Sequence, residues 1–171
     1  MPSLEWPKAV TKLIPGSETA ARIRAAVPDV ELEEAAGWVV IDAPHLPAVA
    51  AFLRDDPALD CRYPTAIIAV DRLDHFELVY YLSSLQRNHM LILKTHALDH
   101  EAPEVPSVAP IWYGANLQER EAYDLMGIRF KDHPSLKRIF LWEGFAGHPL
   151  RKDFLNLPGG QKPGLAHFPK E

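Results

Sequence analysis

"TAIIAVDRLDHFELVYYLSSLQRNHMLILKTHA" (residues 65–97) decides the fold of this chain. Its first run is apolar and β-branched, and Asp74–His75 then predicts a tight turn. The next run alternates with a period of two, which places four apolar side chains on one face of a strand: Phe76, Leu78, Tyr80 and Leu82. "QRNH" turns the chain again before a third apolar run. Three successive strands with short connections predict an antiparallel meander.

Two helices are predicted before the meander. Residues 16–28 form the first, with Ser17 as its N-cap, and residues 45–57 form the second. Between them, residues 30–43 predict two short strands with a turn near Ala36–Gly37. The second helix has one apolar face, made by Leu46, Val49, Ala50 and Leu53. We therefore expect an α+β fold, an antiparallel meander sheet covered by helices, followed by a C-terminal helix and an extended arm.

Composition limits the class of protein. The 171 residues suffice for one domain with a core and an extension, and no apolar run reaches the roughly 18 to 20 residues of a membrane-spanning helix. The N-terminus lacks the basic and apolar regions of a signal peptide. Cys61 is the only cysteine, so an internal disulfide and a cysteine-based metal or iron–sulfur site are excluded. A reducing, cytosolic compartment is the expectation.

Charge is distributed unevenly. The net charge is -5, which argues against general nucleic-acid binding. Residues 1–128 carry a net charge of -9, whereas residues 129–171 carry +4. We expect a domain over residues 1–145 and an extended C-terminal arm over residues 146–171, rich in proline and glycine. Charge alone leaves two interpretations of the arm open: it meets an acidic partner, or it is a solvated basic tail.

A dense group of charges, "NLQEREAYDLMGIRFKDHP" (residues 116–134), marks the predicted C-terminal helix. Gly127 suits the left-handed residue that ends a helix. The start is open: Asn116 and Glu119 fit a capping box, or the helix begins near Pro110. On the longer helix, Glu119 falls in the middle of an apolar stripe, within about 60° of its members. The stripe consists of Trp112, Ala115, Ala122, Tyr123 and Met126.

A carboxylate in an apolar stripe needs a partner, or its pKa rises. Candidate cations for Glu119 follow the helix: Arg129, Lys131, Lys137, Arg138, Arg151 and Lys152. Three interpretations remain open. Glu119 or Asp124 could act with His133 in acid–base catalysis, Glu119 could be a capping residue, or the charges could form an ion-pair network or docking face. We favour the last, because no nucleophile motif or phosphate loop accompanies the charges.

Other groups have ordinary alternatives. His96 and His100, followed by Glu101 and Glu104, could bind a metal but are better interpreted as surface residues on a strand exit. "DHPSLKR" and "GHPLRKD" each place a rigid turn before two basic residues, which is either loop geometry or the presentation of cations to a partner. Trp112 and Trp142 could be core or interface residues.

These motifs carry a family resemblance. "ANLQEREAYDLMGIRFKDHPSLKRIFL" and "GHPLRKDF" resemble the signature of the 30-kDa subunit of proton-translocating NADH:quinone oxidoreductase, respiratory complex I. Leu117 and Asp132 depart from that signature, which commonly has Trp and Gly there. The resemblance covers most of residues 15–155. The related subunit of a membrane-bound nickel–iron hydrogenase or another complex I-related oxidoreductase is the alternative.

The resemblance implies a non-catalytic scaffold subunit of the peripheral arm. It implies no cofactor in this chain, iron–sulfur clusters in neighbouring subunits, and NADH and quinone as the substrates of the complex. The implied partners are the quinone-site subunit of the 49-kDa type and the iron–sulfur subunits, with no nucleic acid. The implied location is the cytoplasmic face of the cell membrane, peripheral and through the complex. The expected interface residues are Glu119, Arg120, Glu121, Asp124, Gly127, Arg129, His133, Pro134, Arg138, His148, Pro149, Arg151, Lys152 and Asp153.

Overall fold

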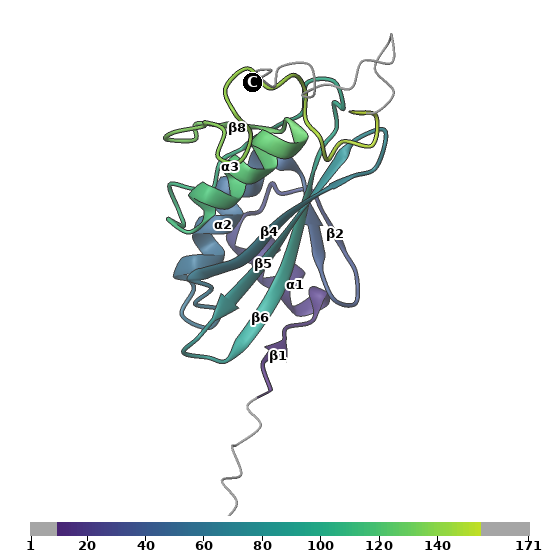
Figure 1. Ribbon diagram of the computed structural model, residues 1–171. Helices are drawn as coiled ribbons and strands as arrows, with labels where there is room; N and C mark the ends of the chain where they lie inside the picture. Colours follow the sequence, from purple (N-terminus) through teal and green to yellow (C-terminus); the bar gives the residue numbers. More distant parts are fainter. Residues whose placement is uncertain (1–9, 155–171) are drawn as a thin grey trace, which may run out of the picture.

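The computed structural model describes residues 10–154 (Figure 1). In chain order its elements are β1 (Lys12–Leu13), α1 (Gly16–Ala26), β2 (Leu32–Glu34), β3 (Val39–Ile41), the 3-10 helix η1 (Ala43–His45), α2 (Leu46–Asp55), β4 (Tyr63–Asp71), β5 (Phe76–Ser84), β6 (His89–Ala97), β7 (Glu104–Pro106), α3 (Ala115–Met126) and β8 (Arg129–Lys131).

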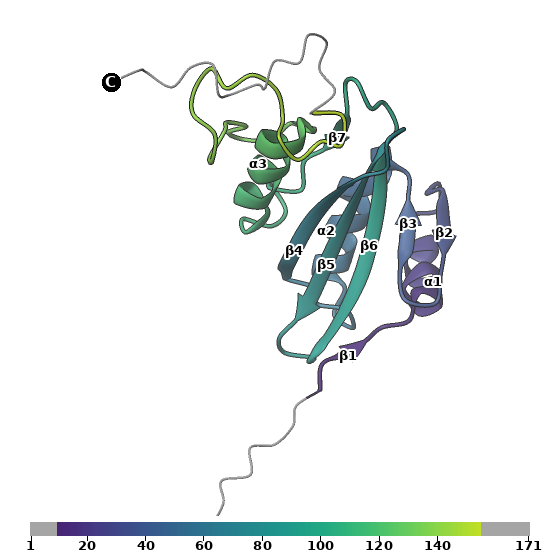
Figure 2. The same cartoon turned by 45° about the vertical axis from the view of Figure 1, so that its right-hand side comes forward.

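The meander is confirmed. Strands β4, β5 and β6 pair antiparallel in sequence, and the main sheet has the order β2-β3-β6-β5-β4. The sheet is nevertheless mixed, because β3 and β1 both run parallel to β6. Helices α1 and α2 lie behind one face of the sheet, and α3 lies beside β4 at one end (Figure 2). The fold is therefore α+β, with three helices and a largely antiparallel sheet.

The core lies between the sheet and the helices. Alternate residues of β5 and β6 face α1 and α2, and the predicted set on β5 is fully buried: Phe76, Leu78, Tyr80 and Leu82. The predicted apolar face of α2 is buried as well: Leu46, Val49, Ala50 and Leu53. Period-two and period-3.6 patterns thus placed both sides of this core correctly.

The start of α1 differs from the prediction. The helix begins at Gly16, with Pro15 at its N-cap, so Ser17 already lies in the first turn and the predicted serine cap is wrong. A Cβ atom at Gly16 would lie 2.0 Å from the carbonyl oxygen of Ala35 and 2.4 Å from that of Trp38. Close packing against the β2–β3 turn therefore leaves no room for a side chain at position 16.

Helix α3 closes the edge of the sheet at β4. The Gln118 side chain accepts a hydrogen bond from the Ile67 amide (2.6 Å) and donates one to the Pro64 carbonyl (3.1 Å). Strand β4 also carries a register shift between Pro64 and Ala66. A capped, irregular edge presents fewer free backbone groups to another strand.

A second small sheet positions the ends of α3. Strands β7 and β8 pair in parallel, with Val105 opposite Phe130, and α3 is the connection between them. The pairing continues past β7, because the Ser107 amide donates to the Lys131 carbonyl (2.8 Å). Residues that precede α3 by about two turns are thereby brought to its buried face.

Candidate functional site

Glu119 lies on the buried face of α3, as the helical geometry predicted, and its side chain has no exposed surface. It accepts hydrogen bonds from the Ser107 hydroxyl (2.5 Å) and the Val108 amide (2.7 Å). Burial raises the pKa of Glu119 to about 7, against the lowering effect of these hydrogen bonds. The predicted basic partners are wrong for Glu119, because a hydroxyl and backbone amides bind its carboxylate instead.

The two predicted starts of α3 are also corrected. The capping box is wrong, since the Glu119 carboxylate is bonded to Ser107 and Val108, away from the Asn116 amide. The longer helix is wrong as well. Residues 109–114 form turns, in which the amides of Ile111 and Trp112 both donate to the Val108 carbonyl, and α3 begins at Ala115. These turns carry the chain from β7 into the helix.

Among the described residues, His133 is the one basic side chain within 4 Å of the Glu119 carboxylate, and the contact is an ion pair only when the histidine is protonated. Its Nε2 atom lies 3.8 Å from the Glu119 carboxylate and 3.2 Å from the Asn116 carbonyl. Burial lowers the pKa of His133, and the neighbouring Arg120 adds to this effect. Both side chains of the pair have no exposed surface, so a substrate would have to displace protein atoms to reach them. The geometry therefore disfavours the acid–base interpretation.

Asp124 lies in a different environment at the other end of α3. One oxygen of its fully buried carboxylate accepts three consecutive backbone amides, those of Ile139 (3.0 Å), Phe140 (2.8 Å) and Leu141 (3.0 Å). The other oxygen accepts the Arg138 guanidinium at 3.0 Å. Burial alone would raise the pKa of Asp124, but the three amides and Arg138 outweigh burial and lower it. Asp124 therefore binds as a carboxylate and fixes the chain after β8.

The end of α3 is packed against a histidine. Gly127 has a φ of 78°, the left-handed conformation predicted for it, and a Cβ atom there would lie 2.6 Å from the His148 ring. His148 donates through Nδ1 to the Asp124 carbonyl at 2.9 Å. Burial lowers the pKa of His148, so the neutral ring is favoured. Glycine is thus required both by the conformation and by the histidine beside it.

Arg151 and Lys152 join the chain after β8 to the main sheet. The Arg151 guanidinium donates to the His100 carbonyl (2.8 Å) and lies 3.0 Å from His100 Nδ1. The other ring nitrogen of His100 lies 3.1 Å from the buried Asp71 carboxylate, which also accepts the Lys152 amide (2.9 Å). The His100 ring stacks on Phe76 with centroids 4.7 Å apart. Since Nδ1 accepts from Arg151, the proton is assigned to Nε2 and donated to Asp71.

Some of the remaining predicted residues contact other parts of the chain, and some are exposed. Arg120 donates to the carbonyls of Lys137 (3.0 Å) and Arg138 (3.3 Å), and Asp153 pairs with Arg151 at 3.1 Å. Pro134 and Pro149 lie in turns. The exposed charged members of the predicted set are Glu121, Arg129, Lys152 and Asp153.

Two contact residues were missed by sequence reasoning, Asp71 and Ser107. His100 was expected on the surface, but its side chain is only 13% exposed and contacts Asp71 and Arg151. Asp71 could have been recognised from the sequence, since it is a charged residue at a position where the alternation of β4 predicts a buried side chain.

The signature residues together hold the segment from residue 132 to residue 154, called the C-terminal segment below. It is built almost entirely of turns and bends, and it displays exposed apolar side chains: Phe140 (63%), Trp142 (44%) and Leu150 (55%). A recess of about 450 Å³ lies between it and α3, lined by Tyr123, Gly127, Arg129, Leu136, Arg138 and His148. Within residues 10–154, no three His, Cys, Asp or Glu side chains are placed to hold a metal ion.

Comparison with solved structures places the fold. A chain of the membrane-bound sulfane sulfur reductase, an archaeal respiratory membrane complex, matches 81% of this chain and 85% of its own length with a TM-score of 0.65. Its sequence identity is 22%, so this likeness concerns the fold alone. A trypsin-resistant fragment of Nqo5 matches 70% of this chain and 98% of its own length, with a TM-score of 0.57 and 27% identity. This chain therefore shares its fold with one chain of that archaeal complex and with the Nqo5 fragment.

Sequence comparison narrows this class to a family. The model of the family described as "Respiratory-chain NADH dehydrogenase, 30 Kd subunit" matches residues 39–159. An NADH-quinone oxidoreductase subunit from Roseiflexus sp. (strain RS-1) is 42% identical over 139 residues, which span 77% of this chain and 79% of that protein. The chain belongs to the 30-kDa subunit family of respiratory complex I, the NADH-quinone oxidoreductase. Among residues 10–154, every helix falls short of the length and apolarity that a membrane span requires.

Proposed function

We propose that this chain is a non-catalytic scaffold subunit in the peripheral arm of a proton-translocating NADH:quinone oxidoreductase. In this role it docks on the quinone-site large subunit, of the 49-kDa type, next to the iron–sulfur subunits. The chain itself carries no cofactor, while NADH, quinone and the clusters belong to other subunits. It reaches the cytoplasmic face of the membrane only as a peripheral part of the complex. Family membership supports the complex, and the arrangement of the C-terminal segment supports the docking role.

One observation carries the docking role: buried polar groups hold an irregular segment so that its apolar side chains face outward. Phe140, Trp142 and Leu150 are exposed on this segment, and the basic residues Arg129 and Lys137 are exposed beside them. Aromatic and arginine side chains contribute most to protein–protein binding energy when a partner covers them. A rigidly held segment also loses little conformational entropy on binding.

The same geometry divides the predicted interface residues by role. Arg138 and Arg151 are engaged within the chain, with Asp124 and with His100 respectively, so they support docking by holding the segment in place. Direct contact with the partner falls to exposed residues between 119 and 154, among them Phe140 and Trp142. Residues 146–154 pack on the domain, since the Leu150 amide donates to the Leu125 carbonyl at 3.0 Å. The proposed arm continues to residue 171, and residues 155–171 lie outside the described structure.

A tagged full-length chain tests the proposal. Purification from gently solubilised membranes of the native host should recover the quinone-site subunit with it. Phe140→Ser should reduce that recovery about tenfold, because it removes an exposed aromatic anchor. Leu85→Ser is the matched control, since Leu85 is 68% exposed on the β5–β6 turn, away from the segment. Recovery of the wild-type chain as a lone monomer would overturn the proposal.

The alternative function is the equivalent subunit of a membrane-bound nickel–iron hydrogenase or another complex I-related oxidoreductase. The fold shared with a chain of the archaeal sulfane sulfur reductase is consistent with this alternative. Identity favours the first function, at 42% to an NADH-quinone oxidoreductase subunit against 22% to the reductase chain. Flanking genes decide between them: genes for an NADH-oxidising module support the first, and hydrogenase maturation genes support the second.

A further inference from the structure

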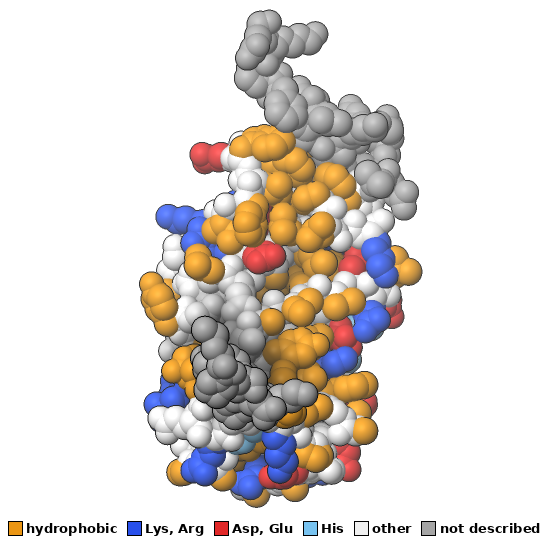
Figure 3. Space-filling view, turned by 60° about the horizontal axis from the view of Figure 1, so that its bottom comes forward, with side chains coloured by type: hydrophobic (Ala, Val, Ile, Leu, Met, Phe, Trp, Pro, Cys, Tyr) orange, Lys and Arg blue, Asp and Glu red, His pale blue; other side chains and the backbone are white. Residues whose placement is uncertain are grey.

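The face of the main sheet turned away from α1 and α2 is unusually apolar. An antiparallel sheet with one face on the core ordinarily presents polar side chains on the other. Here two cross-strand rows are largely apolar, Ala66–Tyr81–Ile92 and Ile68–Val79–Lys94–Val40. Ile68 is 46% exposed, Leu13 44% and Trp38 40%. We call this surface the open sheet face. With the bottom of the molecule turned forward, Figure 3 shows hydrophobic side chains gathered in a band along the molecule.

The charged residues on the open sheet face neutralise one another. Glu77 pairs with Lys94 at 3.3 Å and with Arg72 at 2.9 Å. The Lys94 ammonium also lies 4.4 Å from the centre of the Trp38 ring, a cation–π contact. The middle of the face therefore carries no unpaired charge, and apolar contacts dominate what it can offer to another surface.

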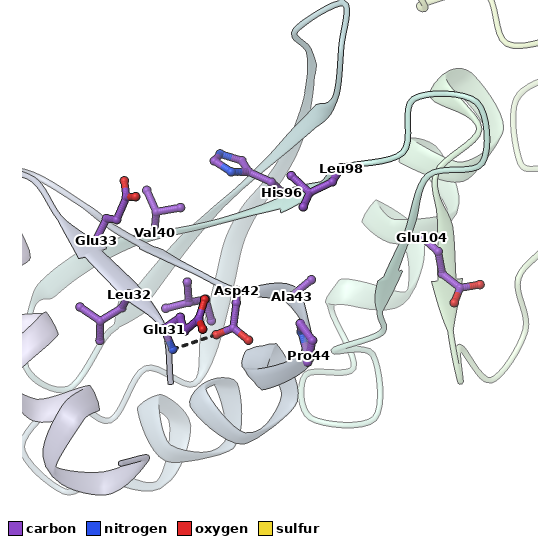
Figure 4. Close-up of a pocket in the computed structure, with 11 residues that line it drawn as sticks. Glu31, Leu32, Glu33, Val40, Asp42, Ala43, Pro44, His96, Leu98 and Glu104 are labelled. Atoms are coloured by element: carbon purple, nitrogen blue, oxygen red, sulfur yellow. Dashed lines mark hydrogen bonds between the residues drawn. The ribbon is translucent and has the colours of Figure 1, made fainter. Parts of the chain in front are cut away.

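An acidic pocket continues the open sheet face at the β2 edge. The apolar row ends at Glu33, which lies opposite Val40 in the strand register. Val40 and Glu33 also line a pocket of about 630 Å³, whose walls come from β2–β3, the end of β6 and β7 (Figure 4). Leu32 and Leu98 contribute apolar surface.

The pocket has an excess of carboxylates. Four acidic residues line it, Glu31, Glu33, Asp42 and Glu104, and its lining contains no Lys or Arg. Asp42 pairs with His45 at 2.6 Å, but the other three form no salt bridge with any residue between 10 and 154. Glu104 is directed away from the other lining residues (Figure 4), so Glu31 and Glu33 are the carboxylates that favour a long cationic side chain, whose stem packs on the apolar surface.

We propose that the open sheet face and the acidic pocket form one docking surface for a second neighbouring subunit of the same complex. That subunit lays apolar side chains across β4, β5 and β6 and places a Lys or Arg side chain in the pocket. This inference rests on the proposed function, because it takes the partner from the subunits of that complex. The docking surface differs from the C-terminal segment at the β2 edge, where the pocket lies, whereas at the β4 edge Ile68 lies beside α3 and Leu150 of that segment.

Charge decides between a partner subunit and other occupants. A second copy of this chain would bring the same acidic pocket and a domain with a net charge of -9 over residues 1–128, so like charges would meet. A membrane surface carrying anionic lipids would be repelled by the pocket for the same reason. A basic protein segment is the occupant that complements both the charge and the apolar face.

Photo-cross-linking in the intact complex tests the docking surface. A photoreactive amino acid is placed at Trp38, which is 40% exposed beside Lys94, at Glu33 and, as a control, at Leu85 on the β5–β6 turn. We expect Trp38 and Glu33 to cross-link to one and the same subunit, within a peptide that contains Lys or Arg, and Leu85 to give no such product. Cross-links only to a second copy of this chain, or no protein cross-link in a chain that still co-purifies with the complex, would overturn the docking surface alone.

A matched pair of charge variants tests the pocket. Glu33 and Glu34 are neighbours on β2, but Glu33 lines the pocket whereas Glu34 pairs with Arg24 of α1 at 3.1 Å. Glu33→Gln should lower the cross-linking yield from Trp38 about tenfold, and Glu34→Gln should leave it unchanged. Equal yields in the two variants would contradict a cationic occupant. Cross-links to a protein from outside the complex would overturn the proposed function together with the partner assigned here.

Discussion

The meander and the C-terminal segment are ordered in two different ways. In β4, β5 and β6 the backbone groups form hydrogen bonds with the neighbouring strands. The inward side chains need not bind backbone groups and can therefore be apolar. In the C-terminal segment, backbone amides are bound by a few buried carboxylates, chiefly Asp124 and Asp71. The difference teaches where substitutions act: the meander depends on many small apolar contacts, whereas the segment depends on a few polar side chains.

The largest expected effect comes from the meander. Leu93 is fully buried on β6, and Leu93→Ala should lower the free energy of unfolding of the full-length chain by about 3 kcal/mol, measured by chemical denaturation. The loss should be global, because the side chain lies in the core between the sheet and the helices. Ile92→Ala is the control, since Ile92 points to the opposite face. Equal losses from the two variants would contradict the assignment of the core to one face.

A smaller and local effect is expected in the C-terminal segment. Asp124→Asn should lower the free energy of opening of residues 139–141 by about 2 kcal/mol, because the buried carboxylate that binds their amides is lost. Amide hydrogen exchange measures this against β5 as an internal reference. Unchanged protection of residues 139–141 would show that other contacts hold the segment.

The lowered pKa of Asp124 sets the direction of its pH dependence. Its folded pKa lies below the ordinary value of 3.8, so its stabilising contribution is present above that value and is lost as pH falls through the folded pKa. Protection of residues 139–141 in the wild-type protein should therefore decline on acidification through this range. Asp124→Asn, which cannot titrate, should show no such step at this site.

Glu119 is expected to give the smallest effect, with the opposite pH dependence. Its pKa is raised from 4.5 to about 7, so the folded state binds an extra proton between these values and stability falls as pH rises through 7. Between pH 6 and pH 8 this loss amounts to about 1 kcal/mol, and Glu119→Gln should remove it. Denaturant titrations of both proteins at several pH values measure the difference. Parallel pH profiles would place the titration elsewhere, for example at His133.

Regular elements with many residues were predictable from periodicity. Strand β5 shows four buried residues in alternation, and α2 shows a complete apolar face, so each pattern could be recognised within its own segment. Strands β1, β2 and β3 have two or three residues, too few for a period to appear. Their pairing, including the parallel contacts of β1 and β3 with β6, is set by tertiary structure.

In the candidate site, the burial of Glu119 was predictable, but most of the contacts were not. Helical geometry placed Glu119 in the core, but its real partners come from Ser107 and Val108, which the parallel β7–β8 pair brings to the helix. Arg138 was expected to face a partner subunit, and in the structure it binds Asp124. A sequence signature names residues, but their hydrogen-bond partners depend on how distant segments fold together, which a local pattern does not predict.

The Gln118 side chain on the edge of β4 has a consequence for synthesis of the chain. By residue 97 the whole meander has been made, yet the glutamine that covers Ile67 and Pro64 is added only with α3. A nascent chain that pauses between these points exposes a complete sheet with a bare edge, a species prone to associate with other strands. Until Gln118 has been added and has emerged, the nascent chain therefore lacks the side chain that covers this edge.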